Sequence, residues 1–144
     1  MGDDARTLKL EVVTPDGEVY CGEAAMVVLP GVEGELGILP QHQPLVTLLA
    51  IGETRIRRPN DEWDYVATGI GYAEVLFDKV LVVTDHGEHA GGIDVDRAEE
   101  AVRRAREILA ERGDLGAEAE VDYFRAEQAL KRAENRLHVA KRMG

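Results

Sequence analysis

The sequence predicts a mixed fold, in which a β-sandwich of two packed sheets is followed by an antiparallel helical hairpin. All five prolines and 12 of the 15 glycines lie in residues 1–92, where they separate short apolar segments, as is typical of strands and turns. Residues 93–144 contain no proline and are rich in alanine, glutamate and arginine, which favour helices. We therefore expect two domains, 1–92 and 93–144, with the seam at Gly91 and Gly92.

Short strands are expected throughout residues 1–92. Leu8, Leu10 and Val12 alternate with polar residues, which is the period of a half-buried strand. The other expected strands are apolar or alternating runs bounded by turn residues, and they lie at 26–29, 45–51, 54–57, 63–67, 72–77 and 80–84. Turn signals at intervals of about 8–12 residues are typical of a β-sandwich or a small barrel.

Two helices are expected in residues 93–144, over about 94–112 and about 118–141. Apolar residues recur on one side of the first helix. In the second helix they recur in steps of four and three from Ala119 to Ala140, which is the spacing of a coiled-coil seam. Alternate seam positions are alanine, so a partner helix can approach closely. The short break between the helices predicts that they pair antiparallel.

Composition excludes several classes of function. The chain has 28 acidic residues against 17 lysines and arginines, a net charge of −11, which argues against a general nucleic-acid binder and against direct binding to anionic lipid. No apolar run approaches the roughly 18 residues of a membrane span, and the first residues are polar and acidic, unlike a signal peptide. We expect a cytoplasmic protein that meets a membrane only through a partner. The single cysteine, Cys21, excludes an intrachain disulfide.

The segment from Gly31 to Leu45 is the most distinctive in the chain. Its three glycines and two prolines predict a stiff loop between strands, and that loop displays the polar residues Glu35 and His42. Two interpretations are open for each residue. Glu35 is either a binding residue or a solvated carboxylate, and His42 is either a binding residue or a hydrogen-bonded loop histidine.

The same segment, GVEGELGILPQHQPLV, resembles the epsilon subunit of bacterial F-type ATP synthases. The runs LEVVTPDGEVYCG before it, ATGIGYAEV after it and EVDYFRAEQALKRAENRL near the end extend the resemblance over nearly the whole chain. It implies a sandwich followed by a hairpin in a non-catalytic rotor subunit of a proton-translocating enzyme. Such a subunit binds gamma and the c-ring at the cytoplasmic face of the membrane. Its hairpin can extend toward the alpha and beta subunits and restrain ATP hydrolysis.

The resemblance also assigns roles to residues of the sandwich. It implies that Gly34, Glu35 and Leu36, together with the region of His42, contact the c-ring. Membrane contact would then run only through that ring.

The run from Ile93 to Ala98 matches a family motif, I/L-D-x-x-R-A, that binds ATP in some bacterial members. The residues implied as a nucleotide site are Glu88, Asp94, Arg97, Ala98, Arg104, Arg132 and Arg136. Arginines suit phosphate because they form charged, forked hydrogen bonds. The chain has no P-loop, so ATP would be a regulatory ligand rather than a substrate or a required cofactor. An alternative remains open, in which Asp94 or Asp96 caps the first helix and Arg97 pairs with an acid one turn away.

The C-terminal segment is basic although the rest of the chain is acidic. Residues 131–144 carry five basic residues and one acid, whereas residues 1–92 carry 16 acids and six basic residues. The basic residues that could inhibit the catalytic subunits in the extended form are Lys131, Arg132, Arg136, Lys141 and Arg142. They could also complement the helix dipole or fold back onto the acidic sandwich. The hairpin turn, 112–121, looks longer than in compact relatives, which weakens the assignment of Arg132 and Arg136.

Two other classes of function remain open alongside this interpretation. A freestanding adaptor built from a sandwich and helices is the main alternative. The third is an enzyme that uses Glu88 and the nearby histidines with a metal. The segment from Asp85 to His89 contains histidine, aspartate and glutamate, which can bind metal ions. No motif elsewhere supplies a further metal ligand, so we expect no metal site.

Overall fold

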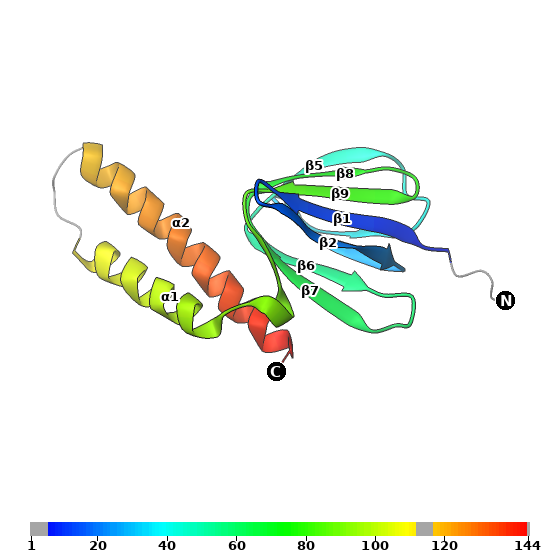
Figure 1. Ribbon diagram of the computed structural model, residues 1–144. Helices are drawn as coiled ribbons and strands as arrows, with labels where there is room; N and C mark the ends of the chain where they lie inside the picture. The colour runs from blue at the N-terminus through cyan, green and yellow to red at the C-terminus, as the bar shows by residue number, and fades with distance from the viewer. Residues whose placement is uncertain (1–5, 112–116, 144) are drawn as a thin grey trace.

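The computed structural model describes residues 6–111 and 117–143, and it has the predicted order of a β part followed by a helical hairpin (Figure 1). The ten strands are β1 (Leu8–Thr14), β2 (Gly17–Ala24), β3 (Met26–Gly31), β4 (Gly34–Ile38), β5 (Leu45–Leu49), β6 (Gly52–Arg57), β7 (Trp63–Thr68), β8 (Gly71–Val75), β9 (Lys79–Thr84) and β10 (Gly87–His89). The helices are η1 (Ala90–Gly92), α1 (Val95–Ala110), α2 (Ala117–Ala140) and η2 (Lys141–Met143).

The strands form one continuous sheet that folds over into two packed layers. The strand order is β10-β7-β6-β3-β5-β8-β9-β1-β2, and β4 pairs with β3 beside this path. Figure 1 shows β5, β8, β9 and β1 in one layer and β6 and β7 in the other. All pairings are antiparallel except that of β1 with β9, which is parallel. The predicted sandwich class is confirmed.

The core lies between the two layers and consists of every second residue along the strands, the ones that point inward. Leu10 and Val12 on β1 are fully buried, as their spacing predicted, and so are Val80 and Val82 on the parallel neighbour β9. Alternation places one face of each strand inside, because successive side chains point to opposite sides of a strand.

The segment from Gly31 to Leu45 differs from the rigid loop that was expected. It contains a strand, β4, which forms a hairpin with β3 through the two-residue turn Val32–Glu33. Gly34, at the start of β4, has a φ of +128°, a conformation that glycine adopts readily. The glycines that suggested a loop therefore close a tight hairpin, and residues 39–44 alone form the loop.

The helices pack on each other through alanine. Ala98 and Ala105 of α1 are buried, as are Ala126 and Ala133 of α2, and such small residues let two helices approach closely. The predicted antiparallel hairpin is confirmed (Figure 1). The hairpin turn was expected over 112–121, but α2 already begins at Ala117, and residues 112–116 lie outside the described residues. No helix among the described residues is long and apolar enough to cross a membrane.

The base of the hairpin docks on the sandwich through a second, smaller apolar cluster. Val139 of α2 is fully buried there with Ala67 of β7, Ala90 of η1 and Ile93. Asn135 adds a hydrogen bond of 2.8 Å from its Nδ2 to the carbonyl oxygen of Gly52. The cluster consists mainly of small side chains, and polar contacts add to this docking.

Candidate functional site

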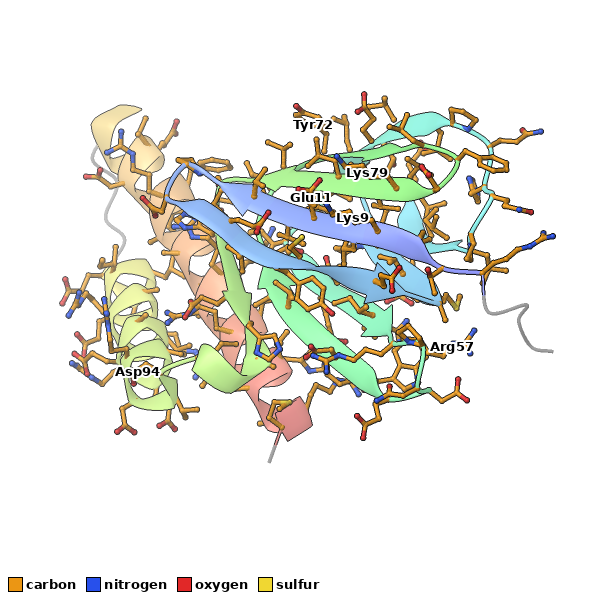
Figure 2. The ribbon with its side chains drawn as sticks, turned by 45° about the vertical axis from the view of Figure 1, so that its right-hand side comes forward. Lys9, Glu11, Arg57, Tyr72, Lys79 and Asp94 are labelled. Atoms are coloured by element: carbon orange, nitrogen blue, oxygen red, sulfur yellow. The ribbon has the colours of Figure 1, made fainter. Side chains whose placement is uncertain are left out.

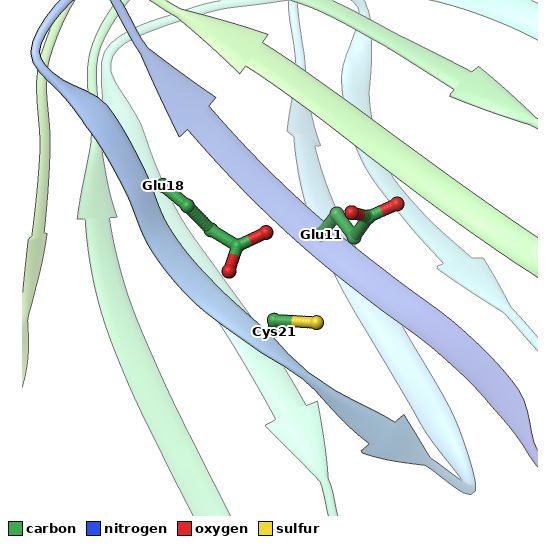
Figure 3. Close-up of side chains that lie close together, drawn as sticks. All are labelled: Glu11, Glu18 and Cys21. Atoms are coloured by element: carbon green, nitrogen blue, oxygen red, sulfur yellow. The ribbon is translucent and has the colours of Figure 1, made fainter.

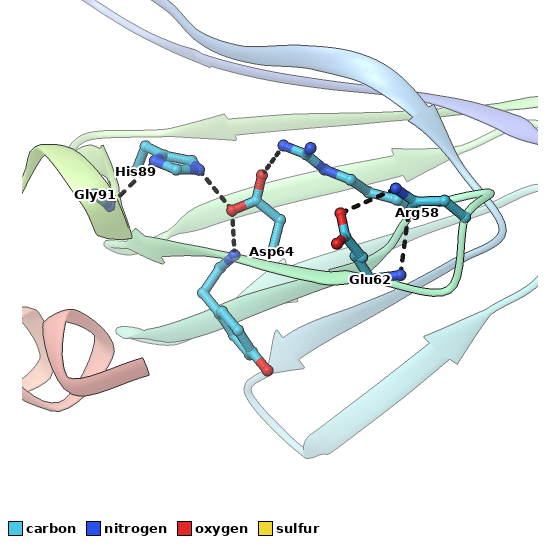
Figure 4. Close-up of polar contacts among 7 residues, drawn as sticks. Arg58, Glu62, Asp64, His89 and Gly91 are labelled. Carbon is cyan, nitrogen blue, oxygen red and sulfur yellow. Dashed lines mark hydrogen bonds and ion pairs between the residues drawn. The ribbon is translucent and has the colours of Figure 1, made fainter. Parts of the chain in front are cut away.

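A buried carboxylate organises the link between the sandwich and the hairpin (Figure 4). Asp64 of β7 is only 4% exposed, and its Oδ2 accepts a hydrogen bond of 2.5 Å from Arg58 Nη2. Its Oδ1 lies 2.5 Å from His89 Nε2 and accepts a bond of 2.9 Å from the backbone N–H of Tyr65. Burial raises the pKa of Asp64, but the hydrogen bonds from Arg58 and Tyr65 and the nearby His89 outweigh it, so the pKa is lowered.

His89 connects that carboxylate to the start of the helical part. Its Nδ1 accepts a hydrogen bond of 3.1 Å from the N–H of Gly91, which makes His89 the N-cap of η1. A ring nitrogen that accepts cannot carry the proton, so Nε2 is the donor to Asp64. The ring also stacks against Tyr20 of β2, with centroids 6.4 Å apart. The entry to the hairpin is therefore fixed to β7.

A pocket of about 400 Å³ lies between the sandwich and both helices. The sandwich contributes residues 67–69 and 86–88, α1 contributes Arg97 and Ala101, and α2 contributes residues from Ala129 to Arg136. Three arginines and one carboxylate of the predicted nucleotide set line this pocket. They are Glu88, Arg97, Arg132 and Arg136.

The remaining members of the predicted nucleotide set lie outside the pocket lining. Ala98 is fully buried in the helix–helix seam. Arg104 is exposed and lies 3.7 Å from Glu100 on its own helix. Asp94 is the N-cap of α1, and its Oδ1 accepts a hydrogen bond of 3.0 Å from the N–H of Arg97. Figure 2 shows Asp94 at the start of that helix. The structure therefore brings four of the seven residues together at the pocket.

The pair between Arg136 and Glu88 is close but poorly aligned. Arg136 Nε lies 2.6 Å from Glu88 Oε1, yet the angle is not that of a hydrogen bond, and this buried nitrogen has no other partner among the described residues. Arg136 Nη2 makes only a long bond of 3.5 Å to Glu88 Oε2. Buried polar atoms are nearly always hydrogen-bonded. The guanidinium therefore faces the pocket with donor capacity that Glu88 does not fully use.

The residues expected to contact a c-ring lie along the β3–β4 edge. Gly34, Glu35 and Leu36 form the first half of β4, which pairs only with β3 among the described residues. Glu35 is exposed, and its Oε1 accepts a hydrogen bond of 2.9 Å from Arg55 Nη2. His42 follows the other end of β4, and its Nδ1 lies 2.7 Å from the carbonyl oxygen of Gln43. Glu35 and His42 thus occupy opposite ends of this edge.

The basic C-terminal residues divide into two groups. Arg136 and Arg142 form ion pairs with carboxylates of the sandwich, Glu88 and Glu53. Arg132 lines the pocket, and Lys131 and Lys141 are exposed. Part of the expected fold-back onto the acidic sandwich is therefore present in the structure.

A hydrophobic outer face on β5 and β8 was not predicted. Val46 and Leu48 of β5 are 67% and 63% exposed, and Ile70 and Tyr72 lie exposed beside them. Leu48 pairs directly with Tyr72 across the two strands. Figure 2 shows Tyr72 on the outer side of the sheet. The run 45–51 was expected as an apolar strand, and because nearly all of its residues are apolar, its sequence does not show which side chains face outward.

One group of metal-ligating residue types lies on β1 and β2 (Figure 3). The ligand atoms of Glu11, Glu18 and Cys21 lie within 4.8 Å of one another. The Glu11 carboxylate already pairs with Lys79 at 2.6 Å, and this hydrogen bond lowers the pKa of Glu11. We therefore interpret the group as charged and polar side chains on the sheet surface.

Comparison with known proteins places both parts of the chain in one family. Residues 7–90 match the model of the ATP synthase delta/epsilon chain β-sandwich domain, and residues 92–141 match that of its long α-helix domain.

Close relatives are similar over nearly their whole length. The ATP synthase epsilon chain of Lactobacillus gasseri is 42% identical and covers 100% of this chain and 99% of its own. The ATP synthase epsilon chain of Halalkalibacterium halodurans is 44% identical, and the match covers 94% of this chain and 98% of that one.

Solved structures share the fold. A chain of the Euglena gracilis mitochondrial ATP synthase OSCP/F1/c-ring assembly matches with a TM-score of 0.74 at 21% identity, over 90% of this chain and 79% of that one. A chain of the Tetrahymena thermophila mitochondrial ATP synthase central stalk and c-ring matches with a TM-score of 0.60 at 13% identity, over 92% and 96%.

Proposed function

This chain belongs to the ATP synthase epsilon-chain family, and from that premise we propose that it couples gamma to the c-ring and restrains ATP hydrolysis through its hairpin. The chain would make and break no bond itself. It would lie at the cytoplasmic face of a bacterial membrane, within a proton-translocating enzyme whose alpha and beta subunits meet the extended hairpin. The named assemblies of the structural relatives, which include F1, the c-ring and the central stalk, support these partners.

The exposed apolar face on β5 and β8 supports a stable protein partner for the sandwich. Val46, Leu48, Ile70 and Tyr72 expose contiguous apolar surface, which in soluble proteins commonly marks an interaction site. We assign this face to gamma, because a permanent rotor contact would bury apolar surface. The β3–β4 edge, which carries Glu35, would then remain for the c-ring.

The pocket between the sandwich and the helices supports the proposal that ATP holds the hairpin closed. Arg97 comes from α1, Arg132 and Arg136 come from α2, and Glu88 comes from the sandwich, so one bound anion would join all three elements. A ligand that binds only the closed form stabilises that form by mass action. The incomplete hydrogen bonding of Arg136 favours a phosphate, which offers acceptors in several directions.

Binding of ATP to the full chain tests the pocket. Arg136→Ala removes a charged donor from the lining and should weaken ATP binding by roughly 10- to 100-fold, since hydrogen bonds to charged groups contribute about 1.5–3 kcal/mol. Arg104→Ala is the matched control, because Arg104 is an exposed arginine outside the lining. Titration calorimetry should show little change for this control. Equal losses in the two variants would contradict the pocket assignment.

Truncation tests the division between the two domains. A chain ending at residue 92 keeps every strand of the sandwich and the apolar face on β5 and β8. We expect it to bind gamma as the full chain does and to lose inhibition of ATP hydrolysis. Failure of the truncated chain to bind gamma, with its strand content intact by circular dichroism, would contradict the assignment.

A further inference from the structure

The last residues of the chain form a second ionic contact with the sandwich, separate from the pocket. Arg142 lies in η2, and its Nε and Nη2 each donate a hydrogen bond of 2.9 Å to the two carboxylate oxygens of Glu53 on β6. Such a forked pair fixes both the position and the orientation of the guanidinium. The carbon Cζ of Arg142 also lies 5.1 Å from the centre of the Tyr65 ring on β7, within the range of a cation–π contact.

Burial makes Glu53 depend on this contact. The Glu53 side chain is only 9% exposed in the folded chain, whereas Arg142 is 38% exposed. The two nitrogens of Arg142 are the hydrogen-bond and ion-pair partners of the Glu53 carboxylate among the described residues. If η2 stays docked without Arg142, an unpaired carboxylate remains buried, and that arrangement is costly. If the hairpin departs, water can solvate Glu53.

The apolar contacts around this pair are small. The docking cluster joins Val139 and Ala140 to Ala67, Ala90 and Ile93, with Tyr65 packed against it, and apart from Tyr65 and Ile93 its side chains are small. Small apolar contacts contribute in proportion to the area that they bury. A single well-oriented ion pair can therefore shift the balance between a docked and an undocked hairpin.

We propose that Glu53, Tyr65 and Arg142 form a C-terminal latch that sets how often the hairpin leaves the sandwich. This inference rests on the proposed hairpin switch and adds a regulatory contact outside the ATP pocket. The latch needs no nucleotide. Of the two arginines that pair with the sandwich, Arg136 and Arg142, it uses Arg142. Arg142 is consequently unavailable to any other acidic partner until the latch opens.

Distance measurements on the full chain test the latch without any catalytic subunit. Cys21 is the one native cysteine and is exposed, so a spin label can be attached there, with a second label at Arg125→Cys on the exposed side of α2. Double electron–electron resonance then gives the populations of docked and undocked hairpins. Arg142→Gln should raise the undocked-to-docked ratio by roughly tenfold or more, because it leaves Glu53 buried and unpaired.

The companion variants separate the latch from a general loss of charge. Glu53→Gln should raise the ratio by a smaller factor, since Arg142 is partly solvated, and the double variant should exceed Arg142→Gln by little because the two residues act as one unit. Arg106→Gln is the control, because it breaks an exposed ion pair of 3.1 Å to Glu134 within the hairpin. It should change the ratio less than twofold. An unchanged ratio in Arg142→Gln, or an equal rise in Arg106→Gln, would overturn the proposal.

A second readout separates failure of the latch from failure of the proposed function. Glu53→Gln alters the sandwich and leaves the hairpin sequence intact, so in the assembled catalytic core it should strengthen inhibition of ATP hydrolysis. A shift in the distance populations without a change in hydrolysis would support the latch and contradict the inhibitory role. A change in hydrolysis without any shift in the distances would contradict the latch.

Discussion

Replacing the buried carboxylate at the hairpin entry should destabilise the chain far more than the same replacement at its surface. Asp64→Asn keeps the shape of the side chain and removes its charge. In the native chain Oδ1 accepts hydrogen bonds from His89 and from the N–H of Tyr65, and Oδ2 accepts one from Arg58. The amide can retain only one of these oxygens. Its NH₂ group would then face a donor, most directly the guanidinium of Arg58.

The size of the effect follows from the burial of Asp64 and from the hydrogen bonds that the amide cannot make. A hydrogen bond to a charged group contributes about 1.5–3 kcal/mol, and an unsatisfied buried donor adds to the loss. Arg58 is 44% exposed, so solvent screens the Arg58–Asp64 ion pair and the lost hydrogen bond itself contributes in the lower half of that range. The unsatisfied buried donor adds to this loss. We expect a loss of about 2–3 kcal/mol. At this chain size that corresponds to a fall in Tm of roughly 5–10 °C.

The pH dependence provides an independent check. Burial alone would raise the pKa of Asp64, but the hydrogen bonds from Arg58 and Tyr65 hold the folded pKa below its ordinary value of 3.8. A lowered carboxyl pKa contributes stability that is complete above the unfolded value and is lost as the pH falls through the folded value. The difference between wild type and Asp64→Asn should therefore be full at pH 7 and shrink below about pH 4.

Urea unfolding followed by circular dichroism measures both effects. Asp61→Asn is the control, because Asp61 is an exposed aspartate that also pairs with an arginine, Arg57, at 3.1 Å. Surface pairs contribute about 0–1 kcal/mol, so this variant should stay close to wild type. If Asp64→Asn cost no more than Asp61→Asn, or if its cost did not change with pH, the role given to the buried carboxylate would be wrong.

Three further variants test other parts of the structure. Gly71→Ala would make a Cβ overlap the carbonyl oxygen of Val83, so it should destabilise the sandwich by more than about 2 kcal/mol in urea unfolding, and a neutral outcome would argue against the β8–β9 register. Asp94→Ala should cost about 1 kcal/mol by removing the N-cap of α1, whereas Asp96→Ala should cost less than half of that, and reversed costs would refute the capping assignment. Leu48→Glu should leave stability within about 0.5 kcal/mol and weaken binding to gamma in a pull-down assay, and unchanged binding would remove that face from the interface.

Elements with a regular apolar period, or with an apolar run bounded by turn residues, could be predicted from the sequence, and those with neither could not. β1 alternates cleanly between apolar and polar residues, β9 is an apolar run after a turn, and the alanine spacing marks the helix–helix seam. β2 was missed because most of its side chains are exposed or half-buried, so its pattern is weak. β4 was missed because its glycines resemble those of a loop. Both of these strands pair at an edge of the sheet, where burial imposes little pattern.

The candidate site was only partly predictable for a geometric reason. Arg97 and Arg104 lie seven residues apart and so share one face of α1, but that spacing carries Arg104 about 10 Å further along the helix, beyond the pocket. A motif in the sequence does not show where the pocket ends. Glu53 and Arg142 are 89 residues apart, and no local signal joins them. The same holds for Asp64 and His89, which only the strand pairing of β7 with β10 brings together.

The most direct test of the account is ATP hydrolysis by the matching alpha–beta–gamma core, measured with and without the full chain over a range of ATP concentrations. We expect the chain to lower hydrolysis at low ATP, added ATP to reverse this effect in part, and Arg136→Ala to remove the reversal while keeping the inhibition. A core that binds the chain and hydrolyses ATP at an unchanged rate at every ATP concentration would contradict the central claim that the hairpin is a nucleotide-held inhibitory switch.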